Sequence, residues 1–96
     1  MAKDKITERT KSRILAIGKN IAYYRELQKL AQEDLARKAG ISTTTLSRIE
    51  SSETYTVHGL PSYIQIADIL KISMDTMMDW SNAEKVYEGG EAHEEG

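Results

Sequence analysis

The sequence predicts an all-α fold of five short helices in one small domain. Apolar residues recur every three or four positions along most of the chain, which is the spacing of one helical face. Serines at helix-start positions, one proline and a glycine separate these stretches. The 96 residues, 40% of them apolar, suit a single domain of about 70 to 80 ordered residues.

The first helix is predicted over residues 12–29, where apolar side chains recur at helical spacing: Ile14, Ile17, Ile21 and Leu27 or Leu30. Gly18 inside this helix costs up to about 1 kcal/mol relative to alanine, which hints at close packing there. Of the adjacent Tyr23 and Tyr24, we expect one ring to be buried or half-buried, and neither to stack on nucleic-acid bases.

A second helix is predicted over residues 32–39. Leu35 and Ala36 form its buried side, and the small Ala36 allows a close helix crossing. Gly40 follows, because the turn after this helix needs a residue that tolerates a positive φ. Ala31 offers no capping oxygen at the helix start, although acidic residues in the first turn compensate through the helix dipole.

Ser42 is the expected N-cap of a third helix, residues 43–51, in which Leu46 and Ile49 face inward. With the helix before it, this segment has the pattern of a helix-turn-helix. Helical geometry gathers the polar residues on the opposite face: Thr43, Thr44, Ser47, Arg48 and Ser51. This compact polar face with one cation is suited to a DNA major groove.

The fourth helix is predicted to open after Pro61, with Ser62 and Gln65 in capping-box spacing, and to run through Leu70. Its expected buried residues are Ile66, Ala67, Ile69 and Leu70. Ser73 is expected to cap a short fifth helix from Met74 to about Trp80. The apolar side chains of that helix, Met77, Met78 and Trp80, form either core or a subunit contact.

The chain ends differ in composition from the predicted helix-turn-helix domain, residues 12–82. Residues 1–11 are expected to form a flexible basic arm, which either follows a DNA backbone or is simply disordered. Residues 83–96 are rich in glycine and glutamate and are expected to form an acidic, disordered tail. Residues 51–59, SSETYTVHG, are expected to form a polar loop.

The net charge of −2 conceals a strong asymmetry. Residues 1–48 hold eleven Lys or Arg against five acids, a balance of +6, whereas residues 49–96 hold two against ten, a balance of −8. The basic half contains the predicted polar face of residues 43–51, where attraction to phosphates would be needed. The alternative is that the charge blocks serve solubility alone.

Gln32, at the entrance of the second helix, has two interpretations. It can contact a DNA phosphate beside the helix N-terminus, or it can remain in solvent and cap its own helix. Phosphate contact is the interpretation we prefer if the helix-turn-helix prediction is correct.

Several function classes are not expected. The chain has no cysteine, which removes disulfides and thiolate metal sites and is consistent with a reducing compartment. His58 and His93 are distant in sequence and are expected to be surface side chains, neither metal ligands nor general bases. We therefore expect no enzyme activity, cofactor or metal. No apolar run is long enough for a membrane span, so a cytoplasmic protein is expected.

The series IGKNI, then Arg25, then AQEDLARKAGISTTTLSRIE and IADILKIS resembles the Cro/C1-type (Xre-like) helix-turn-helix family of phage and bacterial repressors, over roughly residues 14–80. The paired helices and their spacing to Arg25 and to the ILKIS segment make the resemblance fairly specific. It implies a five-helix, lambda-repressor-like DNA-binding domain.

The resemblance also implies roles for individual residues. Gln32 matches the glutamine that contacts a phosphate, and Ser51 matches a DNA-backbone contact. The base-facing positions correspond to Thr43, Thr44, Ser47 and Arg48. Arg25 and Glu50 match positions that form a structural salt bridge in several relatives. Two departures concern Ala31, where relatives often have Thr or Ser, and Ser52, where they commonly have Gly, so contacts from the following loop are not carried over.

These observations favour a sequence-specific DNA-binding transcriptional regulator, with a repressor as the preferred form, bound as a homodimer to a double-stranded, palindromic operator. One alternative is an antitoxin that represses its own operon and covers a toxin with a terminal segment. A helix-turn-helix that binds only protein is a third possibility, and the basic half argues against it.

Overall fold

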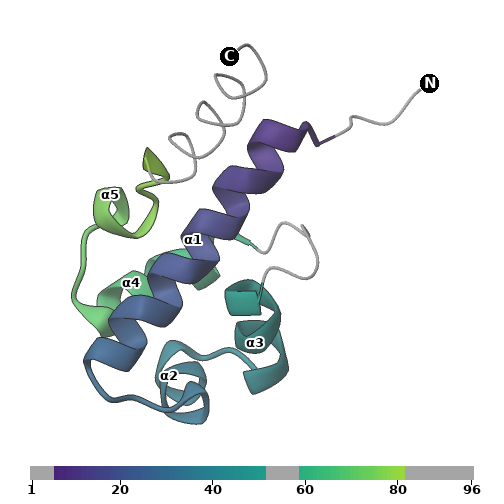
Figure 1. Cartoon of the computed structure of the whole chain (residues 1–96). Coiled ribbons are helices and arrows are strands. Elements are labelled where there is room, and N and C mark those ends of the chain that lie inside the picture. Colours follow the sequence, from purple (N-terminus) through teal and green to yellow (C-terminus); the bar gives the residue numbers. More distant parts are fainter. Residues whose placement is uncertain (1–5, 52–58, 82–96) are drawn as a thin grey trace.

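A computed structural model of the chain describes residues 6–51 and 59–81. Within these ranges every regular element is an α-helix, as predicted, and Figure 1 shows how they are arranged. The five helices are α1 (Glu8–Leu27), α2 (Gln32–Ala39), α3 (Thr43–Ser51), α4 (Leu60–Leu70) and α5 (Met74–Met77). Most of the predicted loop 51–59, the whole of the predicted tail, the first residues of the arm and both histidines lie outside the described residues.

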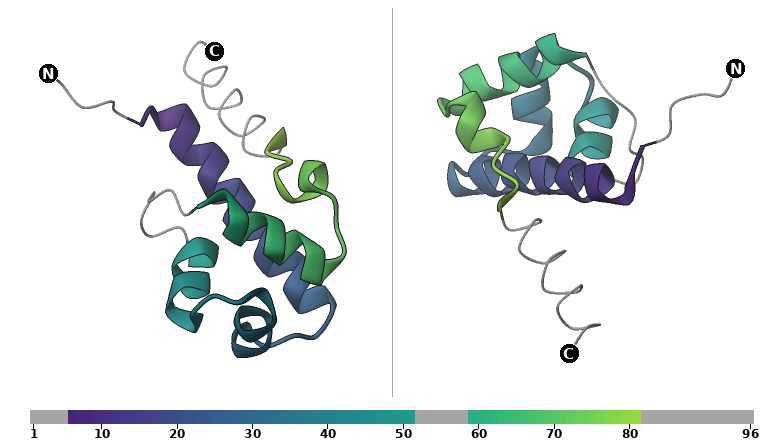
Figure 2. Two further views of the ribbon diagram at one scale, coloured as in Figure 1. Left: turned by 180° about the vertical axis from the view of Figure 1, so that it is seen from behind. Right: turned by 90° about the horizontal axis from the view of Figure 1, so that it is seen from above.

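The longest helix, α1, runs through the whole molecule, and the other four helices gather around it (Figure 1). It packs against α3, α4 and α5, while α2 packs against α3 and α4. In Figure 1 α4 lies behind α1, and in the view from behind in Figure 2 it lies in front of α1. The helices α2 and α3 together form one end of the molecule (Figures 1 and 2).

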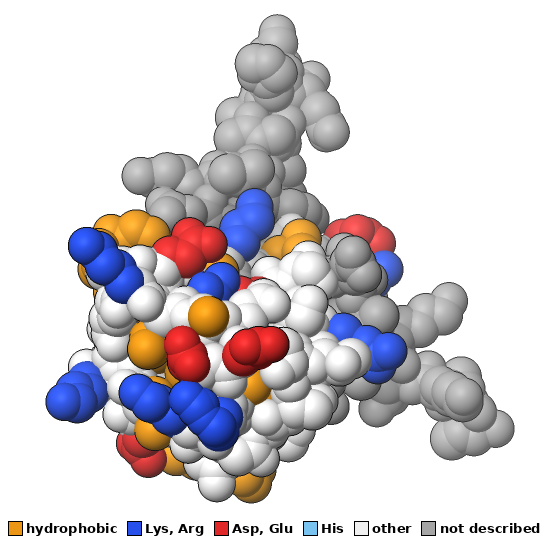
Figure 3. Space-filling view, turned by 90° about the horizontal axis from the view of Figure 1, so that it is seen from below, with side chains coloured by type: hydrophobic (Ala, Val, Ile, Leu, Met, Phe, Trp, Pro, Cys, Tyr) orange, Lys and Arg blue, Asp and Glu red, His pale blue; other side chains and the backbone are white. Residues whose placement is uncertain are grey.

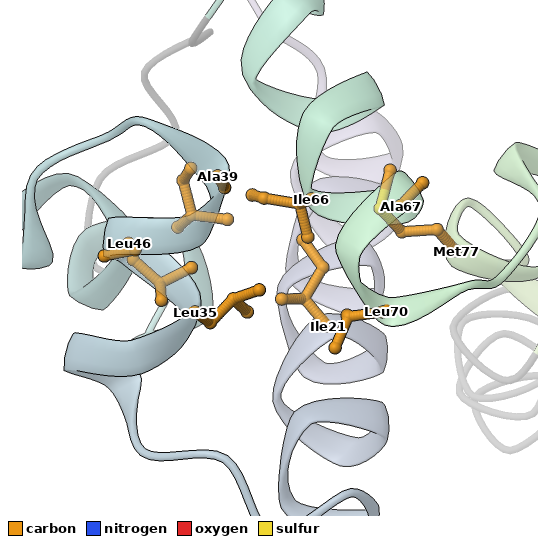
Figure 4. Packing of buried hydrophobic residues seen from close by; sticks show 10 residues of the cluster. Ile21, Leu35, Ala39, Leu46, Ile66, Ala67, Leu70 and Met77 are labelled. Carbon is orange, nitrogen blue, oxygen red and sulfur yellow. The ribbon is translucent and has the colours of Figure 1, made fainter.

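The core is a continuous set of aliphatic side chains from all five helices (Figure 4). Its fully buried large members are Ile21, Leu35, Leu46, Ile66, Leu70 and Met77. Small residues complete it, with Ala36, Ala39 and Ala67 at most 3% exposed. The predicted inward positions of α2, α3 and α4 are buried except Ile69, which is partly buried against the core. The helical periodicity therefore identified which face of these three helices turns inward.

Two helix starts differ from the prediction. Helix α1 begins at Glu8 and not near residue 12, because the hydroxyl of Thr7 accepts a hydrogen bond from the Thr10 backbone amide at 3.1 Å. Residues 8–11 of the predicted arm are therefore helical. Helix α4 begins at Leu60 with Gly59 as its N-cap, and it has no side-chain cap hydrogen bond. The predicted Ser62–Gln65 capping box was therefore wrong, since both residues lie inside the helix.

Helix α5 is shorter than predicted and ends at Met77. Its start is as predicted, because the Ser73 hydroxyl accepts from the Thr76 amide at 3.0 Å. Met77 is fully buried, whereas Met78 and Trp80 are half-buried. Trp80 lies under the guanidinium of Arg13 in α1, 4.9 Å from carbon to ring centroid. Met77 is thus core.

Candidate nucleic-acid interface

Helix α3 has two opposite faces. Leu46 is fully buried and Ile49 is 5% exposed, so this edge is fixed against the neighbouring helices. The other edge turns to solvent, because helical offsets of one, four, five and eight residues share a face. Its members are exposed except for Ser47, which is half-buried: Thr43, Thr44, Ser47, Arg48 and Ser51. We call these five residues the α3 outer face.

A glycine turn and a serine N-cap set the start and the direction of α3. Gly40 ends α2 in the left-handed conformation, with φ 74°, where a side chain would be strained. The Ser42 hydroxyl then caps α3 by accepting from the Thr45 amide at 3.0 Å, and it donates to the Thr45 hydroxyl at 2.8 Å. Both the turn and the cap were predicted from the sequence. The cap engages the amide and hydroxyl of Thr45, whereas Thr43 and Thr44 remain exposed.

Figure 3 shows the α2–α3 end with basic side chains around its rim and with acidic and hydrophobic side chains exposed between them. Arg48 is exposed, and no described acidic residue pairs with it. By contrast, Arg37 near the end of α2 is paired with Asp34 one turn earlier, at 3.1 Å. The guanidinium of Arg48 is therefore available to an external acceptor.

A buried ion pair ties α1 to the end of α3. Arg25 donates to both carboxylate oxygens of Glu50, from Nε at 2.8 Å and from Nη2 at 3.0 Å. Only 11% of the Arg25 side chain and 5% of the Glu50 side chain are exposed. A third nitrogen of Arg25 donates to the carbonyl of Leu30 at 2.7 Å, so the turn between α1 and α2 joins the same network.

Hydrogen bonding to Glu50 raises the pKa of Arg25 above its ordinary value, against the opposing effect of burial. A raised pKa of a basic group means that its contribution to stability is lost only as the pH rises through the folded-state value. For an arginine this window is strongly alkaline, so the cation persists across the physiological range.

Gln32 belongs to this network, an arrangement that neither sequence interpretation included. Its side-chain amide donates to Glu50 Oε1 at 2.9 Å, from the first residue of α2 to the last turn of α3. Glu50 therefore receives hydrogen bonds from α1 and α2 while belonging to α3. Gln32 keeps one further amide hydrogen and its carbonyl oxygen, for which residues 6–51 and 59–81 supply no partner.

The N-terminus of α2, at Gln32, also has backbone amides that no capping side chain binds. Ala31 makes no side-chain cap bond, as its sequence predicted, so the first backbone amides of α2 lack that acceptor. Free amides and the positive end of the helix dipole favour an anion such as a phosphate. Glu33 and Asp34 in the first turn carry the opposite charge.

The remaining predicted position is Ser51. Its hydroxyl donates to the carbonyl of Arg48 at 3.4 Å, within α3. Ser51 shares the α3 outer face with Arg48, and the two side chains lie near the C-terminal end of the helix.

Two amide side chains that the sequence analysis did not single out hold α4 and α5 in place. Asn20 donates to the carbonyls of Met77 and Asp79 at 3.0 and 2.8 Å. Gln28 donates to the Leu70 carbonyl at 2.7 Å. Each contact joins residues more than 40 positions apart, so no local pattern reveals it.

Among the residues that the structure describes, no three His, Cys, Asp or Glu side chains are grouped so that they could hold a metal ion. No helix in the same described ranges is long and apolar enough to cross a membrane.

A family model for helix-turn-helix proteins matches residues 21–77, more than half of the chain. The matched range runs from the buried Ile21 of α1 to Met77 at the end of α5, and it includes the α3 outer face and the Arg25–Glu50 pair. No curated protein and no solved structure matches the chain. On this match, the chain belongs to the Cro/C1-type helix-turn-helix family of DNA-binding regulators.

Proposed function

We propose that this protein is a transcriptional repressor that places α3 in the DNA major groove and acts by occupying its operator. The observation that carries the proposal is the α3 outer face. It is polar and open to solvent on a helix whose opposite edge is buried and whose end is held by the Arg25–Glu50 pair. A rigid helix with such a face fits the width of the major groove.

Arg48 is the strongest candidate for reading a base. It is exposed, unpaired with any described acid and able to donate two parallel hydrogen bonds to one guanine edge. The short side chains of Thr43, Thr44 and Ser47 suit closer contacts, in which hydroxyls bond to base edges and threonine methyls touch thymine methyls.

Gln32 and Ser51 are the proposed phosphate contacts. Glu50 orients the Gln32 side chain at the α2 N-terminus, where its remaining polar atoms and the free backbone amides suit a phosphate oxygen. Ser51, which follows Glu50 in the sequence, lies at the C-terminal end of the outer face. Phosphate contacts at Gln32 and Ser51 would set the position of α3 in the groove.

One outer face of five residues reads few bases, so we propose that two copies bind a palindromic site in the cytoplasm. In such two-fold arrangements the recognition helices lie about 34 Å apart, one turn of DNA. Occupying such a site is enough to exclude a competing protein, which is why repression is the simplest outcome.

The test is selection of bound double-stranded DNA from a random pool, followed by affinity measurements on the recovered site. We expect a palindrome and an affinity that falls steeply with salt, because phosphate contacts release counterions. The Arg48→Ala variant should lose about 1 to 3 kcal/mol of binding and relax one base position in each half-site.

Arg37→Ala is the matched control, because Arg37 is also an exposed arginine but is paired with Asp34 at the end of α2. It should change affinity little and leave the base preference intact. If the Arg48 variant retained the affinity and base preference of the parent, the α3 outer face would not be the reading surface.

A further inference from the structure

Helix α4 exposes an apolar edge that the described fold leaves uncovered. Leu60 is 58% exposed and Ile64 is 41% exposed. They lie four positions apart, so they share one face, whereas Ile66 and Leu70 face the core. Leu60 and Ile64 form what we call the α4 outer edge. A helix that is apolar on two sides normally has a partner on both.

The α4 outer edge is also poor in charge. Residues 59–67 include no Asp, Glu, Lys or Arg, in a chain in which 29% of residues are charged. The first charged side chains on this helix are Asp68, one turn beyond Ile64, and then Lys71 at its C-cap. Depletion of charge around exposed apolar residues is typical of the centre of a protein–protein contact.

Helix α1 provides a comparison within the same molecule. Tyr23 and Leu27 are 58% and 62% exposed, so they present as much apolar surface as the α4 outer edge. Exposed charges surround this pair: Lys19, Glu26 and Lys29. Exposure alone therefore does not distinguish the two edges, but charge does, because Asp68 alone flanks the α4 outer edge on its own helix whereas three charges flank the α1 pair. A second copy of a charged protein docks at lower cost on a patch with little charge.

The position of α4 suits a second copy. Helix α4 lies behind α1 in Figure 1, on the side of the molecule away from α1, while α2 and α3 form one end (Figures 1 and 2). A copy seated on this side leaves that end uncovered. If the two-fold axis runs toward the α2–α3 end, both copies turn α3 to the same side, as one DNA duplex requires.

We propose that the α4 outer edge is the docking surface for a second copy of this chain, with the two α4 helices antiparallel and Leu60 of one copy against Ile64 of the other. This inference rests on the proposed function, since it names the contact between two DNA-bound copies. The arrangement is self-complementary, as a two-fold contact must be. Asp68 then lies beyond the contact and stays in water.

One helix edge per copy buries little area, well below the roughly 1,600 Å² of a standard interface. The free protein should therefore be largely monomeric at low concentration. DNA with two half-sites raises the effective concentration of the second copy. The dimer therefore forms on the operator, and binding is cooperative. A single half-site should be bound with the affinity of one copy.

The test compares the parent with a Leu60→Gln, Ile64→Gln double variant, which keeps helix propensity and adds no charge. The probes are the palindrome selected for the parent and a duplex with only one of its half-sites. We expect half-site affinity within about twofold of the parent and full-site affinity at least about tenfold weaker, without cooperativity. Sedimentation of the free proteins at high concentration should show association for the parent alone.

Leu27→Gln is the matched control, because it removes an equally exposed leucine from α1. It should retain full-site cooperativity. If the α4 variant kept the parent's cooperativity, or if the Leu27 variant lost it instead, the α4 outer edge would not be the docking surface. If the parent bound no DNA in the selection, the proposed function itself would fail. Urea unfolding of each variant checks that the exposed substitutions leave the fold intact.

Discussion

The α2–α3 end of the molecule and the α4–α5 side are attached to α1 by different chemistry. At the α2–α3 end, a buried carboxylate, Glu50, accepts hydrogen bonds from Arg25 and Gln32. On the α4–α5 side, the polar links are uncharged, with the amides of Asn20 and Gln28 donating to backbone carbonyls. The other contacts on this side are made by fully buried apolar side chains.

The two kinds of attachment differ in how they tolerate the loss of one side chain. A buried ion pair needs both partners, because a lone charge inside the protein is costly. An aliphatic contact needs only volume of about the right shape. In the described residues every buried side-chain nitrogen and oxygen has a hydrogen-bond partner, so the network around Glu50 is complete. The orientation of α3 therefore depends on a charged network in addition to packing, whereas that of α4 depends on packing and uncharged hydrogen bonds.

Removing one side of the ion pair should have the largest effect. In Arg25→Ala, Glu50 remains 5% exposed without its main partner, and we expect a loss of about 3 to 5 kcal/mol in the free energy of unfolding. Urea unfolding measures this loss. DNA binding should fall in parallel with the folded fraction, because Arg25 acts through α3 and not on DNA.

An Arg25→Met, Glu50→Leu double variant sharpens this prediction. With no charge left to bury, it should be more stable than the Arg25→Ala single variant. If the single variant were as stable as the parent, the ion pair would have no part in holding α3.

A core truncation on the α4–α5 side should cost about 2 to 5 kcal/mol. Leu70 is 1% exposed at the end of α4, so Leu70→Ala leaves a cavity. Leu70→Met, which conserves volume, should cost less than about 1.5 kcal/mol. If both variants lost the same free energy of unfolding, side-chain volume at position 70 would not be what holds α4 in place.

Two glutamines allow the two attachments to be compared with the same substitution. Gln32→Ala and Gln28→Ala each remove one side-chain amide donor, to Glu50 and to the Leu70 carbonyl respectively. Each should cost about 1 kcal/mol of stability, since Glu50 keeps both Arg25 bonds in the first case. Only Gln32→Ala should also weaken DNA binding, severalfold and alike for all sequences, in a mobility-shift titration.

If both glutamine variants bound DNA equally well, Gln32 would be only a structural residue of the Glu50 network and not a phosphate contact.

Local features of the chain were predictable from the sequence. The left-handed Gly40, the Ser42 and Ser73 caps and the inward edge of α3 each depend on neighbouring residues alone. The family and the all-helical fold were also predicted correctly, because the helix-turn-helix motif has a characteristic spacing.

Features that depend on competition or on distant contacts were not predictable. Near the start of α1, the Thr7 hydroxyl caps the helix before the apolar period begins. At α4, Gly59 takes the N-cap position although Ser62 has better capping chemistry. The bond between Gln32 and Glu50 joins residues 18 positions apart and exists only after α2 and α3 pack together.

The smallest predicted effect concerns Tyr63, the half-buried phenol of α4. Burial raises its pKa above the ordinary value of 10.0, because the packed surroundings disfavour the phenolate. Its contribution to stability is therefore fully present below the unfolded-state pKa and is lost as the pH rises through the folded-state value. We expect the free energy of unfolding to begin to fall above about pH 10, and to fall less steeply in Tyr63→Phe.

Urea unfolding in steps from about pH 8 to about pH 11 measures this dependence. Tyr23→Phe is the control, because that ring is 58% exposed in the folded protein and loses little water on folding. It should keep the alkaline slope of the parent. If Tyr63→Phe also kept that slope, burial of the phenol on the α4 side would not limit alkaline stability. The Arg25–Glu50 pair would not account for the loss either, because the raised pKa of Arg25 places its titration above the pH range of the measurement.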